Sequence, residues 1–87
     1  MSASPPSADA PDQAFTVYWR PGCGFCAQLF RQLERNGLDP VVVNIWEDAT
    51  ARRWLGGAIG SETVPTVRVG ERILVNPHID EVLAALV

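Results

Sequence analysis

The residues most suited to chemistry in this sequence are two cysteines, Cys23 and Cys26, separated by two residues. Cys23 lies where a helix is predicted to begin. There, free amide N–H groups and the helix dipole stabilise a thiolate, and Arg20 adds a positive charge nearby. Cys26 falls one turn later, on the apolar stripe of the same helix. The spacing therefore predicts an exposed attacking thiol at Cys23 and a partly buried resolving thiol at Cys26.

A structural disulfide or a metal centre would be another use for two cysteines. A bridge over two residues closes too small a loop to restrict the unfolded chain much, and such bridges are rare in a reducing cytoplasm. Two Cys and one His cannot fill the four positions of a structural zinc site in one chain. A stable thiolate also leaves a mixed disulfide readily. We therefore expect no metal and a site suited to relaying disulfides.

The second feature that points to a functional site is the proline of Thr63-Val64-Pro65, at the entrance to a predicted strand. By itself this proline is weak evidence for a site, because a proline in that position often only starts a strand. Together with an upstream CxxC pair it predicts a cis Val64–Pro65 bond facing the cysteines. The backbone N–H and C=O of Val64 would then be free to pair with an extended, thiol-bearing substrate.

The elements that must position these residues follow from hydrophobic periodicity and turn residues. The pattern predicts a strand over 15–19, a helix from 24 to a left-handed cap at 36–37, a strand over 41–46, a brief helix around 51–58, a hairpin of strands 66–69 and 72–75, and a closing helix. The order β-α-β-α-β-β-α indicates an α/β fold. Its first two strands should be parallel, and Gly70-Glu71 suits a two-residue type II′ turn between the last two.

Two elements carry further expectations. The apolar density of 41–46 suggests a strand covered on both faces. Asn76 and Pro77 are expected to supply the cap and the first-turn proline of the last helix, which places His78 in its first turn as a solvated residue.

The tryptophans and two pairs of charged residues are expected to have structural or solvated roles. Trp19 and Trp46 are expected to pack on strands, whereas Trp54 could equally be core or the wall of a groove. Glu47-Asp48 is expected to be a solvated loop, and Arg52-Arg53 the polar face of a helix.

Composition limits the remaining possibilities. The chain has 87 residues, of which 47% are hydrophobic and 20% charged, so we expect one small domain. A net charge of −3 with no Lys argues against nucleic acid or an anionic membrane as a partner. Residues 1–14 are polar and small, and are expected to form a disordered tail without a secretory signal. We therefore expect a cytoplasmic monomer whose domain spans 15–87.

Residues 20–26, Arg-Pro-Gly-Cys-Gly-Phe-Cys, together with Thr63-Val64-Pro65 and the element order, resemble the glutaredoxin branch of the thioredoxin superfamily. The resemblance covers roughly 15–87 and implies a thioredoxin (glutaredoxin-like) fold, with a four-stranded mixed sheet flanked by helices. Within that branch, Cys-Gly-aromatic-Cys, Thr-Val-Pro-Thr-Val and the Asn76-Pro77 pair are most similar to the mycoredoxins.

The resemblance also implies roles for individual residues. Cys23 would be the nucleophile and Cys26 the resolving thiol. Arg20 matches a basic residue that in many glutaredoxins helps to hold the carboxylate of the thiol cofactor. The implied substrate-binding set is Arg20, Gly24, Phe25, Thr63, the backbone of Val64, and Pro65 as the cis-proline. No cofactor would be tightly bound. The co-substrate would be mycothiol rather than glutathione, because the Gly-Gly and acidic residues with which glutaredoxins hold glutathione are absent from 75–78.

The resemblance predicts a thiol-disulfide oxidoreductase that reduces protein disulfides or mixed disulfides with a low-molecular-weight thiol. Its partners would be disulfide-bearing or S-thiolated proteins. Two alternatives stay open. Cys-Gly-Phe-Cys is similar to the Cys-Gly-Phe-Ser of monothiol glutaredoxins, in which Cys23 from two chains could hold a [2Fe–2S] cluster. A redoxin reduced directly by thioredoxin reductase is the other alternative.

Overall fold

Four strands and three helices make up the computed structural model, which describes residues 14–87. They are β1 (Phe15–Trp19), α1 (Gly24–Arg35), β2 (Val41–Asn44), α2 (Ala49–Ile59), β3 (Thr66–Val69), β4 (Arg72–Val75) and α3 (Ile79–Leu86). The sheet order is β2-β1-β3-β4, with β1 and β2 parallel and the other two pairs antiparallel. The predicted fold class is confirmed. All but the last residue of the predicted tail, 1–14, lies outside the described residues.

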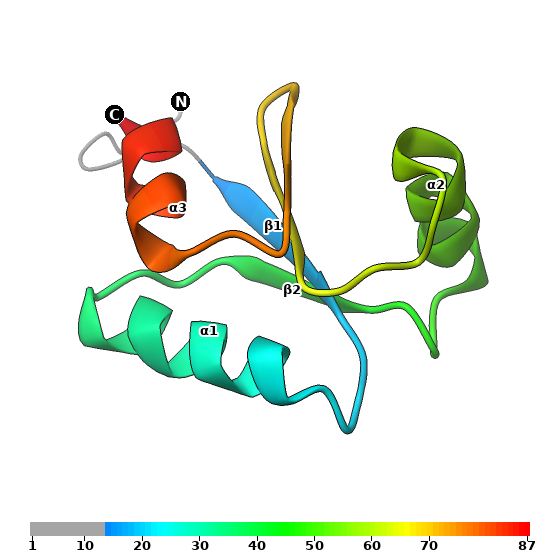
Figure 1. Ribbon diagram of the computed structural model, residues 1–87, viewed down its shortest axis with the longest axis horizontal. Helices are drawn as coiled ribbons and strands as arrows, with labels where there is room; N and C mark the ends of the chain where they lie inside the picture. The colour runs from blue at the N-terminus through cyan, green and yellow to red at the C-terminus, as the bar shows by residue number, and fades with distance from the viewer. Residues whose placement is uncertain (1–13) are drawn as a thin grey trace, which may run out of the picture.

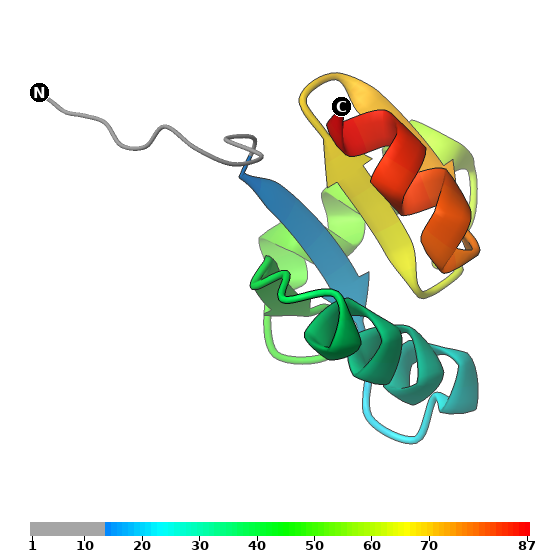
Figure 2. The same ribbon diagram turned by 90° about the vertical axis from the view of Figure 1, so that its left-hand side faces the viewer.

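The helices cover both faces of the sheet, as Figures 1 and 2 show: α1 and α3 lie on one face and α2 on the other. Alternation along β1 supplies both faces, since Val17 belongs to the core beneath α1 and α3, whereas Tyr18 belongs to the core beneath α2. Because both faces of β1 are packed, the position of the turn that joins β1 to α1 is well defined. Among the described residues, no helix is long and apolar enough to cross a membrane.

Helix α1 begins and ends where the sequence predicts. Cys23 is its N-cap, with extended backbone, and Leu29 and Leu33 are buried on its inner face. At the other end Gly37 has a φ of 70°, and the Leu38 amide donates to the Leu33 carbonyl at 3.0 Å. With the bond from the Gly37 amide to the Glu34 carbonyl at 3.0 Å, this forms a Schellman motif, in which a left-handed glycine closes the helix. Both ends are therefore determined by local sequence.

The hairpin of β3 and β4 also matches its prediction. Val69 pairs with Arg72, which leaves Gly70 and Glu71 as a two-residue turn. Gly70 has a φ of 60° and Glu71 is not in the positive-φ region, as a type II′ turn requires.

The predicted strand over 41–46 is wrong in its length and its burial. Strand β2 is an edge strand that pairs only with β1, and the side chains of Val41 and Val42 are 58% and 50% exposed. It ends at Asn44, because the Asn44 side-chain oxygen accepts from the Trp46 amide and the Asn44 carbonyl accepts from the Glu47 amide. The resulting turn stops the strand, and the central position belongs to β1 instead.

The predicted start of the last helix is also wrong. Asn76 is not the cap: it has a φ of 49° and its amide donates to the Pro65 carbonyl at 2.8 Å. Pro77 is buried before the helix, and His78 is the N-cap rather than a first-turn residue. The His78 amide donates to the Glu81 carboxylate at 2.7 Å, so a downstream acid satisfies the N-terminus. The bond to Pro65 holds residue 76 out of the helix.

Candidate functional site

Cys23 and Cys26 lie where the turn after β1 enters α1. Both are free thiols; Cys23 is partly exposed and Cys26 is buried, with 1% of its surface exposed. The Cys26 amide donates to Cys23 Sγ at 3.3 Å. This contact uses one of the amides that an α-helix leaves unpaired at its N-terminus. The structure therefore places one accessible sulfur at the helix N-cap and the second beneath it.

Burial has a direct effect on Cys26. Desolvation, the largest cause, together with the hydrogen bond and the charge of Cys23 raises the pKa of the Cys26 thiol from 9.0 to about 12, and the backbone and charge of Arg20 act in the opposite direction. Cys26 is therefore a protonated thiol at neutral pH. It can attack only when its proton is removed, which suits a second step rather than a first.

The Val64–Pro65 peptide bond is cis, as the sequence predicts. The Cys23 thiol donates to the Val64 carbonyl at a sulfur–oxygen distance of 3.6 Å. Pro65 is buried, and Thr66 is also fully buried, with its hydroxyl donating to the Thr63 carbonyl at 2.8 Å. The Val64 carbonyl therefore faces the sulfur of Cys23, whereas the Thr63 carbonyl is taken by the Thr66 hydroxyl.

Arg20 lies on the turn before Cys23 but points toward an aromatic neighbour. Its guanidinium is 5.6 Å from the ring centroid of Trp46 and donates to the Pro21 carbonyl at 3.1 Å. Trp46 is 58% exposed, so the prediction that it packs on a strand is wrong. The partly exposed Arg20 and the exposed indole of Trp46 therefore form a cation–π pair beside the turn that leads to Cys23.

The remaining predicted binding residues lie around this turn with different surroundings. Gly24 is the first residue of α1, and a Cβ there would meet open space. Phe25 is 65% exposed. The Thr63 hydroxyl shares a 2.8 Å hydrogen bond with Ser61. Gly24 and Phe25 therefore lie beside Cys23, whereas the Thr63 side chain is held by its own loop.

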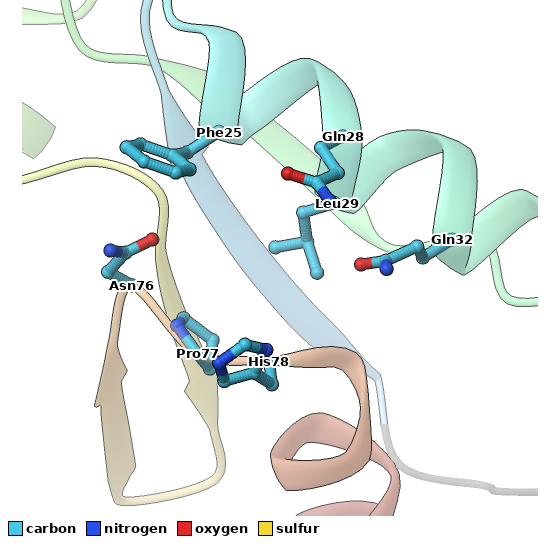
Figure 3. Close-up of a pocket in the computed structure, with 7 residues that line it drawn as sticks. All are labelled: Phe25, Gln28, Leu29, Gln32, Asn76, Pro77 and His78. Atoms are coloured by element: carbon cyan, nitrogen blue, oxygen red, sulfur yellow. The ribbon is translucent and has the colours of Figure 1, made fainter.

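A small cavity next to Phe25 is the feature that the sequence analysis missed. It has a volume of about 150 Å³ and lies between α1 and the β4–α3 loop (Figure 3). Gln28 and Gln32 line it from α1, and Asn76 and His78 from the loop. The spacing of Phe25, Gln28 and Gln32 along one helix face was the available signal.

The other two tryptophans and Asp48 have structural roles. Trp19 packs edge-to-face on Phe30, as predicted, with ring centroids 5.8 Å apart. Trp54 stacks on Tyr18 at 5.1 Å, against the α2 core. Asp48 is more than a solvated loop residue, because its carboxylate accepts from the Ala51 amide at 2.9 Å and caps α2.

Metal ligands are not gathered at this site. Within residues 14–87, no three His, Cys, Asp or Glu side chains lie close enough together to hold a metal ion. Cys23 and Cys26 are the pair that the fold brings together.

Comparisons with known proteins agree with this geometry. Residues 15–74 match the family model described as Glutaredoxin. Two relatives from Mycobacterium tuberculosis, of strains CDC 1551 / Oshkosh and H37Rv, carry glutaredoxin names. Each is 37% identical over 76 residues, which are 85% of this chain and 90% of the relative.

Solved structures share the fold. The thioredoxin-like protein BC3987 superposes with a TM-score of 0.72 at 24% identity, covering 82% of this chain and 97% of that protein. A glutaredoxin from Archaeoglobus fulgidus also gives 0.72, at 20% identity, covering 86% of this chain and 87% of its own. At these identities the likeness shows a common arrangement of strands and helices.

Proposed function

Because this chain belongs to the glutaredoxin family, we propose that it is a thiol-disulfide oxidoreductase that uses Cys23 and Cys26 in sequence. The observation that carries the proposal is the difference between the two sulfurs. Cys23 is accessible at a helix N-cap, whereas Cys26 is buried one turn below it with a raised pKa.

In the first step the Cys23 thiolate attacks one sulfur of a substrate disulfide. A new bond forms between Cys23 Sγ and that sulfur, the substrate S–S bond breaks, and the second substrate sulfur leaves as a thiolate. At the helix N-terminus the Cys26 amide donates to the attacking sulfur, Cys23 Sγ, at 3.3 Å. The Val64 backbone beside Cys23 offers an extended substrate a hydrogen-bonding edge.

In the second step Cys26 loses its proton and attacks Cys23 Sγ. A Cys23–Cys26 disulfide forms, and the substrate's remaining sulfur is released as a thiolate, so the substrate gains two electrons and the protein loses two. Alternatively, where the sulfur held on Cys23 belongs to a small thiol, a second molecule of that thiol attacks this sulfur. The bond to Cys23 Sγ breaks, Cys23 leaves as a thiolate, and a disulfide of the small thiol forms. Either route returns to the dithiol at the expense of an external thiol or reductase.

For the external reductant we propose a low-molecular-weight thiol, mycothiol in preference to glutathione. The support is the similarity of Cys-Gly-Phe-Cys, Thr-Val-Pro-Thr-Val and Asn76-Pro77 to mycoredoxins, together with the absence of the glutathione-holding residues at 75–78. A dithiol regenerated in this way suits a reducing cytoplasm, where we place the protein.

One assay tests the function and its reductant together. The oxidised protein is given mycothiol, glutathione or thioredoxin reductase with NADPH as the sole source of electrons, and reduction of a mixed-disulfide substrate is followed. We expect turnover with mycothiol. No turnover with any of the three would contradict the oxidoreductase proposal, and turnover with the reductase alone would contradict the choice of a small thiol.

A further inference from the structure

Strand β2 forms one edge of the sheet and leaves a row of backbone groups open. It pairs with β1 on one side, and among residues 14–87 no strand pairs with its other side. The Ile45 amide donates to the Trp19 carbonyl at 2.9 Å, so this amide points toward β1. Successive peptide groups of an extended strand point to opposite sides. The N–H and C=O groups of Val42 and the N–H group of Asn44 therefore point away from β1, toward the open edge.

Each end of this edge lacks one hydrogen-bonding group. Pro40, directly before β2, has no N–H, and its carbonyl points outward because the Val41 amide points toward β1. The Asn44 carbonyl already accepts from the Glu47 amide at 3.0 Å. The outward groups are therefore two donors and two acceptors. The donors are the amides of Val42 and Asn44, and the acceptors are the carbonyls of Pro40 and Val42.

These four groups complement those of a second copy of the same edge. If two β2 strands lie antiparallel about a two-fold axis between their Val42 residues, each Val42 amide faces the Val42 carbonyl of the other copy. Two residues away, each Asn44 amide faces the Pro40 carbonyl of the other copy. The proline without a donor thus meets the asparagine whose acceptor is already used. Four hydrogen bonds form, and every outward group of both edges is satisfied.

The side chains of β2 also favour burial. Val41 and Val42 are 58% and 50% exposed, and they lie on opposite faces of the sheet because strand residues alternate. Edge strands are usually protected from pairing by a charged residue, a proline or a bulge. Strand β4, the other edge, carries the exposed Arg72, whereas residues 41–44 include no charge. Pairing two β2 strands would place Val41 opposite Val43 of the other copy and remove apolar surface from water on both faces.

We propose that the protein forms a two-fold dimer in which the β2 strands of two copies pair antiparallel and join their sheets into one. A second copy is the occupant of this edge because its donors and acceptors match themselves under two-fold symmetry. Strand β2 has only four residues, so the contact is smaller than a standard interface of about 1,600 Å². The dimer is therefore weak, with a Kd on the order of 100 µM. In dilute solution the protein is then the monomer that the sequence predicts.

The proposed contact leaves the cysteine site of each copy accessible. Cys23 contacts the carbonyl of Val64, which precedes β3, and β3 lies on the side of β1 away from β2. The two copies therefore meet on the opposite side of β1 from this contact. The inference does not depend on the proposed function, and loss of the dimer should leave turnover per chain unchanged.

Two substitutions at the centre of the contact test the dimer. Val42→Pro removes the central donor, and proline is found on edge strands where its missing N–H would face solvent, so the single copy should still fold. Val42→Lys places two positive charges side by side on the two-fold axis. We expect each variant to raise Kd at least tenfold. Val75→Lys is the matched control, because Val75 is 48% exposed on β4, and it should leave Kd unchanged.

Sedimentation velocity of the full chain, from about 10 µM to about 1 mM, measures these Kd values. A reducing agent is present throughout, so that no disulfide joins the Cys23 residues of two copies. A monomer at the highest concentration would overturn the proposal. A dimer that survives both Val42 substitutions in folded protein would also overturn it, because the contact would then lie elsewhere.

Amide hydrogen exchange gives a second readout that needs no substitution. The Val42 and Asn44 amides face solvent in the single copy and are bonded in the dimer, so their exchange should slow about fourfold over the same concentration range as the monomer fraction falls. The Glu71 amide, in the β3–β4 turn, should exchange at a constant rate. Concentration-independent exchange at Val42 and Asn44 would contradict the dimer. Protection that appears only when another protein is added would assign the edge to a different partner, and would likewise overturn the proposal.

Discussion

Cys23 Sγ lies 3.6 Å from the carbonyl oxygen of Val64, although the two residues are 41 positions apart in the chain. Antiparallel pairing of β1 with β3 brings them together, since Tyr18 is opposite Thr66. A shift of one residue in that register would turn every side chain of β3 to the other face of the sheet. The site therefore depends on the same pairing that buries Val17 and Val67 in the core.

Serine substitutions should distinguish the two cysteines. We expect Cys23→Ser to abolish all turnover, because Cys23 carries the more accessible of the two sulfurs. Cys26→Ser should accumulate a mixed disulfide at Cys23 and keep de-thiolation by a second small thiol. Mass spectrometry after exposure to mycothiol disulfide locates the adduct. An adduct on Cys26 with Cys23 unmodified would reverse the two roles.

Removing Cys23 should make Cys26 more acidic. The hydrogen bond and the charge of Cys23 both help to raise the pKa of Cys26 to about 12, so Cys23→Ala should lower it. Burial, the largest cause, remains, and the pKa should stay above 9.0. The rate of iodoacetamide alkylation of Cys26 across a pH series measures this shift. An unchanged profile would show that burial acts alone. The same relief in a mixed disulfide would favour the second step.

Stability of the reduced protein should fall at alkaline pH. The unfolded Cys26 thiol ionises near 9.0, whereas the folded one keeps its proton to about 12, so the unfolded state binds fewer protons between these values. The free energy of unfolding then decreases as pH rises through that window. Urea unfolding at about pH 8 and about pH 10.5 should show a smaller decrease for Cys26→Ala than for the unmodified protein. Equal decreases would contradict the raised pKa.

The cap of α2 offers a matched pair of acidic residues. Asp48→Ala should lower the free energy of unfolding by about 1 kcal/mol, because the Ala51 amide loses its acceptor. Glu47→Ala, at the exposed preceding residue, should change it by less than about 0.5 kcal/mol. Urea denaturation of both variants measures the difference. Similar losses would show that charge near the helix terminus matters more than the capping bond.

Some parts of the fold were predictable because they depend on neighbours in the sequence. The Schellman end of α1 needs only Gly37 at the correct distance from the last apolar residue, and the β3–β4 turn needs only Gly70. Cys23 as the N-cap of α1 follows from the same short-range logic. For these features the local backbone preference and the final structure agree.

Other parts were decided by contacts between distant segments. Val41 and Val42 are of residue types typical of a core, but β2 is an edge strand because β1 and β3 occupy the centre of the sheet. Asn76 is of a residue type that often caps helices, yet its bond to Pro65 holds it in a left-handed conformation before the helix. In both cases an interaction across the fold outweighed a local preference.

The sequence by itself determined the chemistry: two thiols at CxxC spacing, the helix that carries them, the proline at the strand entrance and the order of elements. Only the tertiary structure decided how deeply each sulfur is buried, that Val64 faces Cys23, and that Gln28 and Gln32 share a cavity with Asn76 and His78. The physical reason is the separation along the chain over which each kind of interaction acts. Helix caps and tight turns are set by bonds within a few residues, whereas burial, sheet register and cavities arise from packing between segments far apart in the chain.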